Sequence, residues 1–153
     1  MYFYPFQRLV IDESLVLLKG RLCDCKTGYV QDLVIYTGTD IDIPANDPLG
    51  HSGSVVKTLM APFLGKGHIL YTDNYYTSPG LSEFLHHHKT GLVGTVRENR
   101  KGMPVFPSGM RRGETAFRKK GHHLAIKWCD RKQFALLSGI HTGIATPTGR
   151  LAH

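Results

Sequence analysis

The stretch from His68 to Thr95 constrains the fold most, because it predicts a strand, an acidic turn, a helix and a second strand in direct succession. Ile69–Tyr71 is an apolar run of strand length, and it is followed at Asp73 by residues that favour turns. Ser78 precedes a proline, as expected at a helix start, and Gly91 lies where a helix end favours a left-handed residue. Open α/β sheets collect functional groups at the carboxyl ends of such strands. The sequence therefore predicts an α/β fold with chemistry at Asp73.

The rest of the chain alternates apolar runs with turn-forming residues. An apolar stripe at helical spacing predicts a helix that Ser54 caps and Pro62 bends or ends. Runs rich in β-branched, aromatic and leucine residues predict strands at Leu9–Ile11, Ser14–Leu22, Tyr29–Tyr36, Leu92–Val96, Glu114–Arg118, Leu124–Cys129 and Phe134–Ser138. We expect three parts: a core over residues 1–96, a basic β-rich segment over 97–141 and a loose tail over 142–153.

Composition excludes several classes of protein. The 153 residues support one domain, and a hydrophobic fraction of 41% with 20% charged residues is typical of a soluble globular protein. No apolar run has the length of a membrane span, and the N-terminus lacks the features of a signal peptide. We therefore expect an intracellular protein without a membrane partner. Three cysteines give no disulfide framework; Cys23-x-Cys25 would have only Cys129 to complete a metal site, so free thiols are favoured.

Charge is concentrated in one segment. Residues 1–96 hold seven Lys or Arg and nine Asp or Glu, whereas residues 97–132 hold eleven Lys or Arg and three Asp or Glu, a net charge of +8. A basic block this local indicates contact with a polyanion. The alternative is a solvated face that keeps the protein soluble.

Asp12 and Asp73 are the candidate catalytic and metal-binding residues. Each follows an apolar run, and neighbouring strands would bring the two carboxylates together. Adjacent carboxylates repel each other unless a cation compensates their charge. Mg²⁺ takes few oxygen ligands from the protein and leaves positions for phosphate oxygens. The alternative is that both residues only end strands and begin turns.

Two histidine clusters are not expected to bind metal. His86–His88 on a helix would point about 100° apart, and His122–His123 on a strand would alternate between its faces. Trp128 is more typical of a core than of a base-stacking platform. Lys127 beside it would contact a phosphate while a tyrosine after Asp73 packs on a base.

Several motifs in order resemble one known family, the piggyBac-type transposases and the proteins derived from them. The motifs, which together span about Pro5 to His141, are Ile11–Ser14, Lys19–Arg21, Lys26–Val30, Tyr36–Gly38, Asp73–Ser78, Gly94–Pro104, Lys127–Asp130, Leu136–Ser138 and Ile140–His141. The resemblance implies an RNase H-like catalytic domain with three aspartates that bind two Mg²⁺ ions, for which Mn²⁺ substitutes, and cut and join DNA. Asp12 matches the first aspartate and Asp73 the second.

The resemblance also implies that the basic β-rich segment is an insertion facing DNA, in a nuclear protein that forms a homodimer in the family. The candidate DNA-binding residues are Arg97, Arg100, Lys101, Arg111, Arg112, Lys119, Lys120 and Lys127. They would contact phosphates without reading the base sequence.

The chain also departs from the family pattern. The family's third aspartate lies in a downstream Gly-Gly-Val-Asp motif, and no Asp follows Asp130 here. A stretch that carries most of a sheet strand is missing between Arg21 and Cys23, and we expect a hairpin of Ser14–Leu22 with Tyr29–Tyr36 in its place. We therefore expect a remnant of a transposase catalytic domain that is inactive by itself. The alternatives are a non-enzymatic DNA-binding or chromatin-associated module, and an active transposase of which this is a partial chain.

Overall fold

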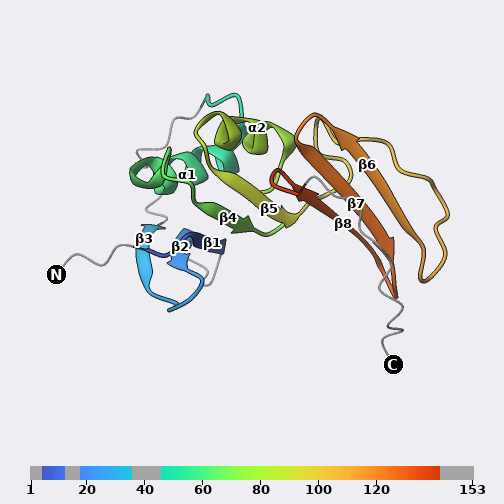
Figure 1. Ribbon diagram of the computed structural model, residues 1–153, viewed down its shortest axis with the longest axis horizontal. Coiled ribbons are helices and arrows are strands. Elements are labelled where there is room, and N and C mark those ends of the chain that lie inside the picture. The colour runs from blue at the N-terminus through green and yellow to red at the C-terminus, as the bar shows by residue number, and fades with distance from the viewer. Residues whose placement is uncertain (1–4, 13–17, 36–45, 142–153) are drawn as a thin grey trace.

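The fold is an α/β arrangement built on one mixed sheet of eight strands, as seen in a computed structural model that describes residues 5–12, 18–35 and 46–141. The strand order is β3-β2-β1-β4-β5-β8-β7-β6. The elements are β1 (Arg8–Asp12), β2 (Leu18–Asp24), β3 (Val30–Ile35), α1 (Gly50–Met60), the 3-10 helix η1 (Ala61–Phe63), β4 (Ile69–Thr72), α2 (Pro79–His87), β5 (Gly91–Thr95), β6 (Thr115–Lys120), β7 (His123–Cys129) and β8 (Gln133–Ser138). Figure 1 shows β6–β8 extending away from the part of the sheet that the helices cover.

Three neighbouring strands are parallel. β1 pairs with β4, and β4 pairs with β5. A parallel pair needs a crossover connection, and α2 supplies it between β4 and β5. The carboxyl ends of β1, β4 and β5 therefore lie along the same edge of the sheet.

The main core lies between this part of the sheet and the two helices. It joins Leu9, Ile11, Leu22, Leu70 and Leu92 from the strands to Val55, Val56, Leu59, Met60, Leu81 and Leu85 from the helices, and Tyr76 completes it. All of these side chains are at most 1% exposed. Burial on this scale is the main source of stability, at about 1.5–3 kcal/mol for each large apolar side chain.

The start of α2 was predicted correctly. Ser78 accepts a hydrogen bond from the backbone N–H of Leu81 at 3.1 Å, and Pro79 is the first helical residue. The end of the helix was predicted wrongly: the left-handed residue is Lys89, with φ of 52°, and not Gly91. Gly91 instead begins β5, where an added Cβ would lie 2.2 Å from Ile140 Cγ2.

The start of α1 was also predicted wrongly. The helix begins at Gly50, without a side-chain cap, one turn before the expected cap Ser54. Ser54 is buried inside the helix, and its Oγ donates to the carbonyl of Gly50 at 3.2 Å. A serine within a helix forms this bond to the preceding turn, so its preference for caps misled the prediction. The 3-10 helix η1 carries Pro62 near its start, as expected of a residue that ends an α-helix.

β2 and β3 form the expected antiparallel hairpin, with a turn through Asp24 and Gly28. β2 also pairs antiparallel with β1, so it lies inside the sheet and β3 forms the edge. β2 is described from Leu18 onward. Residues 13–17, where the predicted strand starts, lie outside the described residues, as do most of the predicted loop before α1 and the predicted tail.

β6, β7 and β8 form the predicted antiparallel meander, and β8 joins it to the rest of the sheet by pairing with β5. A second, smaller core of Val96, Phe106, Ala125, Ala135 and Leu137 lies under these strands. The α/β, RNase H-like class predicted from the sequence is confirmed in its mixed sheet and helices. Among the described residues, no helix has both the length and the apolar character needed to cross a membrane.

Candidate functional site

Asp12 and Asp73 lie at the ends of adjacent parallel strands. The register of β1 and β4 pairs Val10 with Tyr71 and Ile11 with Thr72, so the two aspartates are the next residue on each strand. Both residues are exposed. The expectation that neighbouring strands bring these carboxylates to one edge of the sheet agrees with this register.

The burial pattern along β1 indicates which face of the sheet carries Asp12. Leu9 and Ile11 are fully buried against the helices. Because strand side chains alternate between faces, Asp12 belongs to the face opposite the helices. Its partner on β2 is Arg21. Asp12 and Asp73 are both exposed, so solvent and ions reach this part of the sheet.

The turn after β4 is held by the backbone and side chain of Asp73 itself. One carboxylate oxygen accepts from the N–H of Tyr75 at 3.0 Å, which leaves the other oxygen for further ligands. The carbonyl of Asp73 accepts from the N–H of Thr77 at 3.1 Å and from its hydroxyl at 2.6 Å. That hydroxyl also lies 2.7 Å from Thr72 Oγ1 in a buried pair. This local network fixes the direction in which the strand end projects.

Arg100 fastens the same turn from outside. Its guanidinium donates to the carbonyls of Tyr75 and Asn74, the latter at 3.2 Å. Arg100 was predicted to contact DNA, but these two bonds engage it with the protein backbone. No local pattern predicts this role, because the contact joins residues 25 positions apart in the chain. The guanidinium of Arg100 is therefore engaged by the protein itself.

Lys127 was also predicted to contact DNA, and it too contacts another group of the protein. It is 4% exposed, and its ammonium group lies 2.9 Å from Glu98 Oε2. A buried lysine paired with a carboxylate is not available to a phosphate. The neighbouring Trp128 stacks on Phe134 across β7 and β8, with ring centroids 5.5 Å apart.

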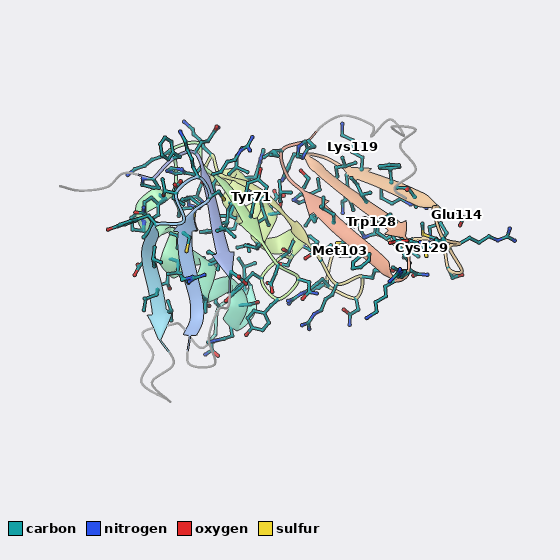
Figure 2. All side chains as sticks on the ribbon, turned by 90° about the horizontal axis from the view of Figure 1, so that it is seen from below. Tyr71, Met103, Glu114, Lys119, Trp128 and Cys129 are labelled. Carbon is teal, nitrogen blue, oxygen red and sulfur yellow. The ribbon has the colours of Figure 1, made fainter. Side chains whose placement is uncertain are left out.

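The other predicted DNA contacts are exposed. They are Arg97, Lys101, Arg111, Arg112, Lys119 and Lys120. Arg112 forms an exposed ion pair with Asp130 at 3.0 Å, which is a weak interaction at such a site. In Figure 2, Lys119 lies at the opposite end of the β6–β7 hairpin from Glu114 and Cys129.

A cavity of about 350 Å³ adjoins the acidic edge. Its lining includes Asn74 from the turn after β4, the segment Thr95–Asn99 after β5, and Phe134 of β8. Arg97 therefore shares a concave surface with the residue that follows Asp73. Of the groups that line this cavity, the guanidinium of Arg97 suits a phosphate and the aromatic ring of Phe134 suits a base.

The donor set at this edge fits a hard divalent cation. Carboxylate oxygens on accessible strand ends suit Mg²⁺ or Mn²⁺, whereas neither imidazole nor thiolate belongs to the pair. Asp12 and Asp73 are the residues that would hold such an ion.

The mixed sheet, with Asp12 and Asp73 following neighbouring parallel strands, has the α/β fold class expected from the motifs. A family model described as transposase IS4 matches residues 21–148, and the chain belongs to this family of DDE-type transposases. The fold resembles a cryo-EM structure of a piggyBac transposase synaptic complex with hairpin DNA, with a TM-score of 0.80 and 23% sequence identity. The alignment covers 95% of this chain and 35% of that one. The predicted resemblance to piggyBac-type transposases is thereby confirmed. Membership of the family implies the use of a divalent metal ion.

Proposed function

We propose that this chain supplies part of a DNA transposase catalytic domain, in which Asp12 and Asp73 bind Mg²⁺ or Mn²⁺ and exposed basic residues hold DNA in the nucleus. The observation that carries the proposal is the parallel register of β1 and β4, whose next residues are these two aspartates. The nuclear location follows from DNA as the partner.

The residues around the acidic edge would have three separate roles: binding the ion, positioning Asp73 and orienting the DNA. Asp12 and Asp73 bind the ion, which supplies charge for activating the attacking oxygen and stabilising the leaving one. The hydrogen bonds of the turn after β4, including those from Arg100, keep Asp73 in position. Arg97, in the adjoining cavity, orients a phosphate of the DNA strand.

We further propose that the 153-residue polypeptide does not cleave DNA by itself. Two carboxylates bind and orient an ion less completely than three do, and loss of a group that stabilises the transition state costs several kcal/mol of barrier in other preorganised sites. Among the described residues, Asp12 and Asp73 belong to no group of three side chains that could hold a metal ion.

The metal-binding part of the proposal is tested by titration with Mn²⁺. We expect Asp12→Asn and Asp73→Asn each to weaken binding about tenfold or more, because each removes one of two charged ligands. Asp32→Asn is the matched control, since it removes an exposed strand carboxylate on β3, two strands from Asp12. Equal binding by all four proteins would show that the acidic edge holds no ion.

The DNA-binding part is tested by the salt dependence of affinity for duplex DNA. The logarithm of the affinity should fall linearly with the logarithm of salt concentration, and the double variant K119Q/K120Q should reduce the slope by about two. Lys66→Gln is the control, because it lies before β4 and outside the basic segment. An affinity that does not change with salt would exclude contact with phosphates. Sedimentation of the same samples tests the expected homodimer.

A non-enzymatic DNA-binding module is the second candidate function. It is favoured by six predicted contacts that remain exposed on and before the three-stranded meander. The two candidates differ in their need for metal. If Asp73→Asn and removal of divalent ions leave DNA affinity unchanged while K119Q/K120Q lowers it, the non-enzymatic function is supported.

A further inference from the structure

We propose that Glu83, His122 and His123 form a zinc site that ties the turn between β6 and β7 to helix α2. This site is separate from the acidic edge and does not depend on the function proposed above.

The three side chains come from segments that are distant in sequence. Glu83 lies on α2, His122 in the turn after β6, and His123 at the start of β7. One potential ligand atom from each lies within 4.8 Å of the others. From the sequence, neither histidine cluster was expected to bind metal, since the side chains of each cluster alone point in diverging directions. The tertiary structure instead brings His122 and His123 to the same carboxylate.

The carboxylate of Glu83 lies close to both imidazoles. Glu83 Oε2 lies 3.5 Å from His122 Nε2 and 3.9 Å from His123 Nε2. Ligands about 2.0–2.1 Å from a tetrahedral ion are roughly 3.3 Å apart, so zinc would draw the three groups together from separations of up to 4.8 Å. Within the described part of the chain, both Nε2 atoms are buried and neither has a hydrogen-bond partner. Buried polar atoms without partners are uncommon, and an ion would satisfy both.

The charges around the cluster are mixed. Lys120 lines the same cavity as the three side chains, and its positive charge opposes a cation. The carboxylate of Glu83 is therefore needed beside the two imidazoles.

Two further histidines support the arrangement. His87 Nε2 lies 3.1 Å from Glu83 Oε1, the carboxylate oxygen that does not face the pair, and so orients the group. The ring of His86 stacks on that of His122, with centroids 3.7 Å apart and planes inclined by 9°. Glu83 and His122 thus each have a supporting contact from a histidine of the helix segment.

Two imidazoles and one carboxylate favour zinc over Mg²⁺, which prefers oxygen ligands. The fourth position faces a cavity of about 370 Å³ that the three residues line together with Pro79, Gly102 and Lys120. The open position would take water. With the ion bound, the β6–β7 hairpin and its basic residues are fixed relative to the helix-covered part of the sheet.

The test is calorimetric titration of the tag-free chain with Zn²⁺. Cys25 and Cys129, which are not buried, are replaced by serine in every protein so that thiols do not compete. We expect one ion per chain, and binding weakened about tenfold or more by Glu83→Gln and by His123→Gln. His88→Gln is the matched control: it belongs to the same histidine run, but its Nδ1 lies 2.8 Å from the carbonyl of Phe84. It should bind as the parent does.

Two measurements keep the test independent of folding defects and of the acidic edge. Co²⁺ added to the parent should give the visible spectrum of a tetrahedral site, and Zn²⁺ should raise the melting temperature of the parent and of His88→Gln only. Asp73→Asn should retain zinc binding, even if it loses Mn²⁺. The proposal is overturned if the parent binds no zinc at about 100-fold excess over the chain. It is also overturned if Glu83→Gln and His123→Gln bind as tightly as the parent.

Discussion

Asp24 is a fully buried carboxylate at the end of β2. Hydrogen bonds to its oxygens offset the free-energy cost of burying the charge. Its oxygens accept from the N–H of Phe6 at 3.1 Å and from the N–H and hydroxyl of Thr27 at 2.9 and 2.6 Å. Burial raises the pKa of Asp24, but the hydrogen bonds from Thr27, Phe6 and Lys26 together hold it below the usual 3.8. The ionised form is therefore favoured in the folded protein.

This shift predicts a specific dependence of stability on pH. A lowered pKa in the folded state contributes stability above the unfolded pKa near 3.8, and that stability is lost as the pH falls through the folded pKa. Asp24→Asn should be less stable than the parent at pH 7, with a difference that shrinks below pH 3.8. Urea unfolding across this pH range measures it, and the exposed Asp32→Asn should show no comparable trend. A difference that does not change with pH would contradict the role given to the charge.

Gly94 of β5 allows the turn after β4 to approach closely. A Cβ at this position would lie 2.3 Å from the carbonyl oxygen of Thr72 and 2.4 Å from Thr77 Oγ1. Gly94→Ala should therefore lower the free energy of unfolding by about 1–3 kcal/mol or more, because backbone must shift. Gly80→Ala is the control in urea unfolding, since its Cβ would meet only the flexible end of Leu49 at 2.9 Å. Equal stability of the two variants would contradict the close approach.

At the scale of elements, α2 tests how far local signals determine a helix. Ser78→Ala removes the acceptor for the N–H of Leu81 and should cost about 1 kcal/mol in urea unfolding. Ser78→Asp should restore most of it, because aspartate is an equivalent cap. Ser82→Ala in the same helix should be neutral or stabilising, since among the described residues the buried Ser82 Oγ has no partner. A loss at Ser82 as large as that at Ser78 would contradict the cap.

Elements with strong local signals were predicted well, whereas their ends were not. The strands and α2 were found within a few residues, because apolar alternation and a serine-proline start are local features. The start of α1 at Gly50 and the left-handed Lys89 were missed. Both depend on which segments pack against the helix ends, and no local pattern contains that information.

At the scale of the whole molecule, β8 decides whether the chain unfolds as one unit. Its pairing with β5 joins the meander to the helix-covered sheet, although each part has its own buried cluster. Leu137 of β8 is 1% exposed, so Leu137→Ala should cost about 2–5 kcal/mol. We expect one transition in which far-UV circular dichroism and the fluorescence of Trp128, the single tryptophan, coincide.

The two signals report on different parts, since both α-helices lie outside the meander that holds Trp128. If Leu137→Ala lowered the midpoint of the fluorescence transition alone, the meander would be a separate folding unit. Val105→Ala is the matched control, because this side chain is 89% exposed and its truncation should change stability by less than about 0.5 kcal/mol.

The candidate site was predictable in part. Two acids after apolar runs, at the ends of strands, were enough to single out Asp12 and Asp73. From the sequence, β1 and β4 were expected only to be neighbouring strands. Their register, which pairs residues 61 positions apart, came from the fold. The positive charge of the basic segment was evident from the sequence, but the bonds of Arg100 to carbonyls and the burial of Lys127 with Glu98 were not.

The sequence by itself determined the alternation of strands and helices, the acidic strand ends, the basic segment and the motifs of the family, because each is carried by residues close together in the chain. Only the tertiary structure decided the strand order, the partners of Arg100 and Lys127, and the meeting of Glu83 with His122 and His123. These features depend on contacts between distant segments, which packing of the whole core selects and local patterns do not specify.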